Sequence, residues 1–434
     1  MREDGHAGCR MKQASLLLGL IAFMMAVACT GAPAQTGTQA PVPPEGASGA
    51  TEQQGFSASP RYFGEFKDLY PQEYATFIAG GVEREADGLV HSHASLRYRV
   101  ETDEKLQDTG ASCLSCKTSE FNQLYEGFGI EAFNMAYNEA SGLIVDYFSC
   151  RTCHETGKPA EKVGATSVAY KAYAAGFLSE IDPKSAACGQ CHNATCDYTR
   201  YLVGKDDRPL ESFSPYRYGT DADALRKAAI EDGATTFFDE EGGLGLFSLG
   251  HPDIELFQGS VHQKAGLTCA SCHMPVLQDD SGTATVSHNS SGSPFENEAA
   301  MRLCLGCHGD QGVSDTVAMR AFLRERQAGA AALEAAYEER LALLKGLIVA
   351  RSASHDAAGG SIAAGQGIEA LGSATAPDAL DYARGAYADA YYYLQFQRAS
   401  AETPGTKIAH NPTEMRSLLQ KGMQRIEEGI AALS

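Results

Sequence analysis

Ten of the thirteen cysteines in this 434-residue chain fall into five Cys-x-x-Cys pairs, and no other sequence feature constrains the fold as strongly. The pairs are Cys113/Cys116, Cys150/Cys153, Cys188/Cys191, Cys269/Cys272 and Cys304/Cys307. The next residue is Lys117 in the first pair and His154, His192, His273 and His308 in the other four. A disulfide framework or a zinc ribbon has no reason to place a histidine after four of five pairs.

The Cys-x-x-Cys-His spacing is typical of c-type haem attachment. Two thiols three residues apart bond the two vinyl groups of one haem, and the following side chain then lies beneath the iron as an axial ligand. We therefore predict five c-type haems, attached through the ten paired cysteines, with Lys117 and the four following histidines as ligands. The leftover Cys196 is expected to be a small buried residue.

Other histidines are candidates for the second axial position. A haem with a proximal histidine takes a distal ligand when it acts as a six-coordinate electron carrier. The sequence offers His262, His288 and His410, together with one of His91 and His93, of which His93 is preferred. Four distal ligands match four histidine-ligated haems.

Lys117 distinguishes the first haem site from the other four. An amine must lose its proton to bind iron, against an ordinary pKa near 10.4, so its surroundings must be desolvated and charge-compensated. If no side chain supplies a distal ligand, one face of this iron stays open for a small molecule. The first site is therefore the candidate catalytic site.

The N-terminal residues predict export. After Met11 and Lys12 comes an apolar stretch from Ala14 to Ala28, too short to span a membrane, and then Cys29. We expect residues 1–28 to be an export signal, with Met11 as an alternative start, and residues 29–59 to be a flexible linker. The mature chain would be periplasmic or on the outer face of the membrane. Lipidation of Cys29 and simple cleavage are alternatives.

The rest of the chain predicts a mainly α-helical fold. We expect residues 60–312 to form the pentahaem-binding catalytic region and residues 313–434 a C-terminal helical region. Apolar residues at helical spacing are Leu333, Tyr337, Leu341, Leu344 and Ile348, and later Met415, Leu418, Leu419, Met423, Ile426, Ile430 and Leu433. Asn411, Pro412 and Glu414, directly after His410, form a helix-start signal. His355, in a Ser/Ala/Gly-rich stretch, is expected in an exposed loop. The formal charge of −20 argues against nucleic acid as a partner.

One Cys-x-x-Cys-Lys site followed by four Cys-x-x-Cys-His sites resembles the ammonia-forming cytochrome c nitrite reductases. The resemblance runs from about Tyr62 to the C-terminus and is strongest from His251-Pro252 through His262, Cys269 to Pro275, and His288. It implies a compact haem core with long C-terminal helices that form a homodimer. It also implies six-electron reduction of nitrite to ammonium, with electrons from a membrane or periplasmic cytochrome or another quinol-linked donor. In this family the residue matching His251 stands over the catalytic haem, and those matching His262, His288 and His410 are distal ligands.

The chain departs from this family around the predicted open iron. The family's active-site Tyr is matched by Tyr198 if three residues are inserted after His192, with Tyr201 as the alternative. The family's Arg is replaced by Asp108 in an ungapped reading, and the nearby cations Lys105, Arg97 and Arg99 do not match its position.

The family commonly binds a calcium ion beside this site through a Glu, a Lys and a Gln. Ser248-Leu249-Gly250 replaces the Lys-x-Gln, and Asp197 at best replaces the Glu, so we expect no calcium here or only weak binding. A cation from the protein would then neutralise the site. Because of these departures, the sequence leaves two alternatives to nitrite reduction: an electron-transfer cytochrome without catalysis, and a reductase of hydroxylamine or sulfite.

Overall fold

The computed structural model describes residues 68–77, 111–144, 150–154, 162–196, 209–290, 293–357, 378–399, 401 and 403–434. The chain divides into two units, 1–42 and 43–434, and every described residue belongs to the second. The predicted export signal, the linker and the candidates His91, His93, Asp108, Tyr198 and Tyr201 lie outside the described residues.

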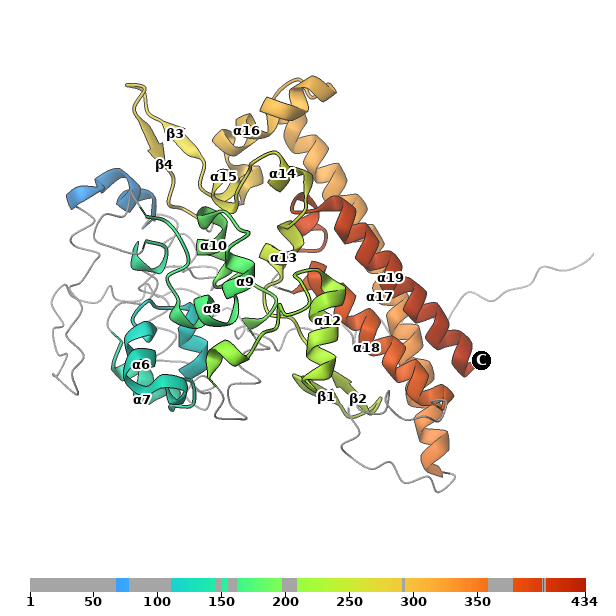
Figure 1. Cartoon of the computed structure of the whole chain (residues 1–434). Helices are drawn as coiled ribbons and strands as arrows, with labels where there is room; N and C mark the ends of the chain where they lie inside the picture. The colour runs from blue at the N-terminus through green and yellow to red at the C-terminus, as the bar shows by residue number, and fades with distance from the viewer. Residues whose placement is uncertain are drawn as a thin grey trace, which may run out of the picture. The chain divides into compact units, whose positions relative to one another are not determined.

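Helices dominate this unit, as predicted (Figure 1). The α-helices are α6 (Phe121–Phe128), α7 (Tyr137–Gly142), α8 (Val168–Tyr173), α9 (Ala175–Leu178), α10 (Pro183–Gly189), α12 (Ala222–Glu231), α13 (Asp253–Phe257), α14 (Val261–Lys264), α15 (Cys269–His273), α16 (Glu298–His308), α17 (Thr316–Ala357), α18 (Ala379–Arg398) and α19 (Pro412–Leu433). Short 3₁₀ helices are η1 (Ala111–Cys116), η2 (Gly129–Phe133), η3 (Cys150–Thr152), η5 (Leu210–Ser212), η6 (Pro294–Glu296), η7 (Gly309–Gln311) and η9 (Thr406–Ala409).

The strands form two small antiparallel hairpins. β1 (Phe237–Asp239) pairs with β2 (Leu244–Leu246), and β3 (Val276–Gln278) pairs with β4 (Ala284–Val286). None of the described helices combines the length and the apolar character that crossing a bilayer requires.

The three longest helices, α17, α18 and α19, pack against one another along one side of the unit (Figure 1). Their shared core includes Tyr337, Leu344 and Ile426, all fully buried, and the Tyr337 hydroxyl donates to the Ala390 carbonyl oxygen at 2.7 Å. Gly422 is required here, because a Cβ atom at this position would meet the Tyr337 side chain at 1.8 Å. Apart from Leu333, the predicted stripes therefore contribute to the helical core.

One residue of the first stripe lies outside this core, and one expectation about α17, the loop at His355, is wrong. Leu333 is 51% exposed, because it lies outside the arc of the helix that faces α18 and α19. His355 lies within α17 and not in a loop, since the helix continues to Ala357 through alanine and serine residues that a helix tolerates. At α19 the prediction is confirmed: Asn411 is the N-cap and accepts from the Glu414 N–H at 3.1 Å, and Pro412 is the first helical residue.

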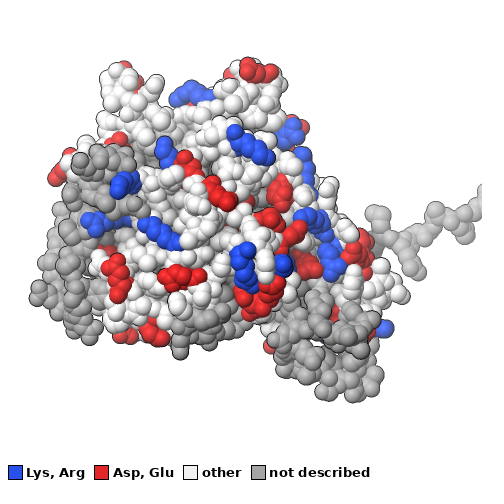
Figure 2. All heavy atoms as spheres, in the orientation of Figure 1, with Lys and Arg blue, Asp and Glu red and all other residues white. Residues whose placement is uncertain are grey.

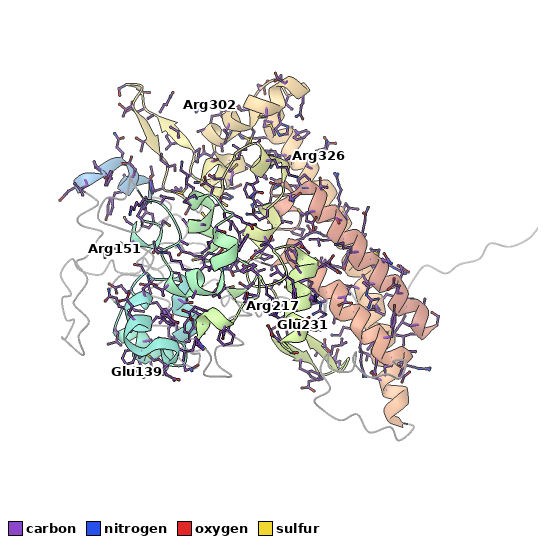
Figure 3. All side chains as sticks on the ribbon, in the orientation of Figure 1. Glu139, Arg151, Arg217, Glu231, Arg302 and Arg326 are labelled. Carbon is purple, nitrogen blue, oxygen red and sulfur yellow. The ribbon has the colours of Figure 1, made fainter. Side chains whose placement is uncertain are left out.

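The net negative charge is not gathered on one patch of the face that Figure 2 shows, where acidic and basic side chains are intermixed. An example is Arg217, whose Nη2 lies 3.3 Å from Glu231 Oε2 and which fastens the segment before α12 to the end of that helix (Figure 3).

Candidate functional site

Each Cys-x-x-Cys pair lies on a short helical turn. The turns are η1, η3, the end of α10, α15 and the end of α16. A helical turn places residues i, i+3 and i+4 on one side, so the two cysteines and the next residue point together. Local caps start these turns: Thr268 and Ser271 form a capping box on α15, and Asp182 and Asn297 cap α10 and α16.

Cys307 is the exception among the predicted attachment cysteines that the structure describes. Its side chain is exposed, whereas Cys304 and the other described members of the five pairs are half-buried. The cause is its position on the last turn of α16, at one end of the unit, where Gly309 and Asp310 are also exposed (Figure 1). Protein atoms therefore do not enclose this thiol as they do the others, and the attachment of a haem here, as at the other pairs, stays a prediction.

The turns from different parts of the chain touch one another. Cys191 Sγ lies 2.8 Å from the Cys116 carbonyl oxygen, which joins the first and third pairs. The Cys269 N–H donates to Ser185 Oγ at 3.2 Å, which joins the third and fourth pairs. Three of the five sites therefore lie in direct contact.

Two pairs of predicted ligands face each other at the spacing that a shared metal requires. The ring centroids of His154 and His288 are 6.3 Å apart, as are those of His273 and His410. An imidazole nitrogen binds a transition metal at about 2.0–2.1 Å, so two rings on opposite sides of one iron have centroids roughly 6 Å apart. The residues present thus fit haem ligation.

Backbone carbonyls orient two of the candidate distal ligands. His262 Nδ1 lies 2.8 Å from the Ala409 carbonyl oxygen, and His288 Nδ1 lies 3.0 Å from that of Val286. A carbonyl oxygen only accepts, so Nδ1 carries the hydrogen in both rings, and the lone pair of the other nitrogen is left for a metal.

An acidic residue holds His192. Asp253 Oδ2 accepts from His192 Nδ1 at 2.9 Å, and Asp253 Oδ1 lies 2.8 Å from Lys407 Nζ. Burial alone would raise the pKa of Asp253, but Lys407, His192 and His410 together hold it well below its ordinary value. The carboxylate is therefore ionised.

His251 lies beside the third site. Its ring centroid is 5.3 Å from that of His192, too close for an iron between the two rings. Burial, followed by the neighbouring His192, lowers the pKa of His251 to about 3, and Lys117 also contributes to this lowering. The imidazole of His251 is therefore neutral, and its position over the first haem stays a prediction.

The segment 193–196 packs directly against the residue before His251. The His251 N–H donates to the Asn193 carbonyl oxygen at 3.0 Å. A Cβ atom at Gly250 would lie 1.9 Å from Cys196 Sγ, so the thiol occupies the space that a side chain at 250 would need. Cys196 is half-buried and not fully buried as expected, and it explains why position 250 is glycine.

Sequence reasoning missed Glu255, which is 5% exposed. Its Oε1 accepts from the Tyr216 hydroxyl at 2.6 Å and its Oε2 from the Ala194 N–H at 2.9 Å. Burial raises the pKa of Glu255 to about 8, although both hydrogen bonds act to lower it. The only signal in the sequence was its position four residues after His251, on the buried face of α13.

Some predicted roles are not tested by this geometry. Tyr198 and His93 lie outside the described residues, as does the side chain of Cys113. Within the described ranges, no three His, Cys, Asp or Glu side chains are grouped so as to hold a metal ion. The expectation about calcium stays a prediction, since Asp197 is also outside these ranges.

The chain is similar to known proteins over most of its length. It matches the cytochrome c552 family over residues 89–434. A cytochrome c-552 of Haemophilus ducreyi is 28% identical over 222 residues, which cover 49% of this chain and 42% of that protein. The chain therefore spans less than half the length of this curated relative. A cytochrome c nitrite reductase from Desulfovibrio desulfuricans has a similar fold, with a TM-score of 0.63 and 18% identity over 86% of this chain and 85% of that one.

Proposed function

The chain belongs to the cytochrome c552 family, and we propose that it is a pentahaem reductase that converts nitrite to ammonium at a haem bound by Lys117. The feature that carries the proposal is the one Cys-x-x-Cys site followed by a lysine, Lys117; this site contacts the third site through Cys116, and His251 lies beside His192 of that third site. The fold similarity to a nitrite reductase supports it.

Five c-type haems are the cofactors of this family, and the chain has five sites to attach them. We assign His288 as the distal ligand opposite His154, and His410 opposite His273, because their ring spacing suits an intervening iron. Of the remaining candidates, His262 is assigned to the His308 haem and His93 to the His192 haem. The His192 ring is too close to His251 for those two to share an iron.

When bound, the haems would supply electrons and an open iron that takes the substrate nitrogen. The reaction takes up six electrons and eight protons for each nitrite and yields one ammonium and two waters. The ring N–H of His251, which is neutral at physiological pH, would donate a hydrogen bond to the oxygen atoms of bound substrate. The Tyr198 hydroxyl would donate another. Lys117 would hold the opposite side of the site.

Asp108 favours a second candidate substrate. If this residue stands where the family has Arg, an anionic substrate loses a charge-assisted hydrogen bond, which would cost about 1.5–3 kcal/mol. A neutral substrate such as hydroxylamine would lose less. Sulfite, an anion like nitrite, would not gain from this change.

The location and partners follow from the same proposal. We propose that the chain is exported to the periplasm, either free or anchored through a lipid on Cys29, and receives electrons from a membrane or periplasmic cytochrome or another quinol-linked donor. We further propose a homodimer formed by the C-terminal helices. The exposed Leu333 and Leu343 on α17 support an interface there.

The test is the ammonium yield per nitrite consumed, with a reduced viologen dye as the electron donor to the purified, haem-loaded protein. We expect near-stoichiometric ammonium. Turnover of hydroxylamine but not of nitrite would favour the second substrate. No turnover of either, with five haems present, would overturn catalysis and favour an electron-transfer cytochrome.

A further inference from the structure

One carboxylate, Asp253, lies between predicted ligands of two different haems. Its Oδ2 accepts from His192 Nδ1 at 2.9 Å, and its Oδ1 lies 3.7 Å from His410 Nδ1. In the proposed assignment, His192 is the proximal ligand of the third site and His410 the distal ligand of the fourth. We propose that Asp253, balanced by Lys407, is a positioning residue that sets the reduction potentials of these two haems together, an inference that rests on the proposed ligand assignment.

Lys407, which pairs with Asp253, is 5% exposed. Its Nζ lies 2.8 Å from Asp253 Oδ1 and donates to the carbonyl oxygen of Ala399. A buried ammonium is retained only where a counter-charge and hydrogen bonds replace its water, and this site supplies both. Lys407 is thus placed to compensate Asp253.

The ion pair between Asp253 and Lys407 joins two segments that are far apart in the sequence. Asp253 begins α13, which lies between α10 and the C-terminal helices (Figure 1). Lys407 lies on η9, three residues before His410, so the cation and the second ligand share one rigid turn. The Ala409 carbonyl on the same turn orients His262. A shift of α13 relative to η9 would therefore affect both haems.

The physical effect of such a carboxylate on a haem has a definite sign. An ionised acceptor on Nδ1 makes the imidazole a stronger donor to iron, and a nearby negative charge favours the oxidised, more positive iron. Both effects lower the reduction potential. Lys407 offsets the charge but not the hydrogen bond to His192, so the two residues act in opposite directions.

The experiment is a spectroelectrochemical titration of the haem-loaded protein, with electron paramagnetic resonance to separate the low-spin haems. Asp253→Asn should raise two of the potentials, and Lys407→Gln should lower the same two. Each change should be at least tenfold in the reduction equilibrium, which is 59 mV for a one-electron couple. Lys407→Arg, which keeps the charge, should leave both near the wild-type values.

Lys421→Gln is the matched control, because Lys421 Nζ also pairs with an aspartate, Asp223, at 2.6 Å, but both side chains are about half exposed. It should shift no potential. If Asp253→Asn does not assemble, the two Lys407 variants still decide the matter. A shift of one haem alone, of none, or of all five equally would overturn the proposal, as would an equal effect of the control.

This test needs no turnover, so it is independent of the nitrite assay. Two potentials that move in opposite directions in the two variants, in a protein that makes no ammonium, would support the shared carboxylate and refute the reductase. Normal ammonium production with unchanged potentials would support the reductase and refute the shared carboxylate.

Discussion

The long C-terminal helices α17, α18 and α19 differ from the helices described between residues 111 and 312, which have at most eleven residues. The buried side chains of the long helices are mostly apolar and repeat at helical spacing. The long helices bury Tyr337, Leu344 and Ile426 against one another, and Leu244 and Leu246 of β2 belong to the same core. In the haem-binding region short turns carry the cysteines, and their orientation depends on polar contacts such as that between Asp253 and His192. The haem-binding region also has an apolar core, which includes Leu114, Phe121 and Tyr170, but its cysteine-bearing turns are held by polar contacts as well.

Gln190, which is 3% exposed, shows how a buried polar side chain holds the haem-binding region together. Its Oε1 accepts from the N–H groups of Thr166 and Ser167 at 3.0 and 2.9 Å, and its Nε2 donates to the Ala187 carbonyl at 2.9 Å. Each of these bonds satisfies a buried backbone group, which would otherwise cost about 1–3 kcal/mol. Polar side chains therefore stabilise this region where long helices are absent.

The largest effect is expected from Lys117, the residue proposed to bind the catalytic iron. Lys117→Leu keeps Cys113 and Cys116, so the haem should remain attached, but nitrite turnover should fall by more than about a hundredfold, since even residues that only orient a metal ligand are worth 10–100-fold. The initial rate of ammonium formation and the haem content check this. Lys162→Leu, an exposed lysine, is the control. A rate within tenfold of wild type would show that Lys117 binds no catalytic iron.

Two leucines on α17 test the packing of the C-terminal helices. Leu344 is fully buried, so Leu344→Ala should lower the free energy of unfolding by about 2–5 kcal/mol. Leu333 is 51% exposed, and Leu333→Ala should change it by no more than about 0.5 kcal/mol in the monomer. Urea unfolding followed by far-UV circular dichroism measures both. Equal losses would mean that Leu333 is buried in an interface, as the proposed dimer requires.

The last effect concerns the pH dependence that a buried acid gives to the stability of the haem region. The pKa of Glu255 is about 8 in the folded chain, against 4.5 ordinarily, so between these values the folded chain holds a proton that the unfolded chain has lost. The contribution of Glu255 is fully present below pH 4.5 and is lost as the pH rises to 8, by up to about 1.4 kcal/mol per pH unit.

Glu255→Gln should remove this slope, because the amide stays neutral. Urea midpoints at about pH 6 and about pH 8 compare the two proteins. The variant should lose less stability than the wild type between the two values. Identical losses would mean that Glu255 is already ionised in the folded chain.

Much of the helical region could be predicted from sequence, because its signals are local. The stripe through Tyr337, Leu341 and Leu344 and the helix start at Asn411 and Pro412 both appear in the structure. Periodicity did not show that Leu333 is exposed, and composition did not show that the helix continues past His355, so the loop expected there was wrong.

Features of the candidate site could be predicted only where a motif of neighbouring residues identifies them. The number of haems is of this kind, since each Cys-x-x-Cys pair and the residue after it lie on one helical turn, and the attachment of a haem at each pair stays a prediction. Which histidines face each other was not predictable, because no pattern links His154 to His288 or His273 to His410. The exposure of Cys307 was not predictable either, because spacing does not show how much protein surrounds a turn.

The sequence by itself determined the haem-attachment motifs, the exceptional lysine after the first pair and the C-terminal helices, because covalent spacing and helical periodicity are local properties. Only the tertiary structure decided that Cys196 fills the space at Gly250, that Glu255 bonds Tyr216, and that Asp253 meets Lys407. These contacts join residues far apart in the chain, and their partners are chosen by burial and charge compensation, which exist only once the chain has folded.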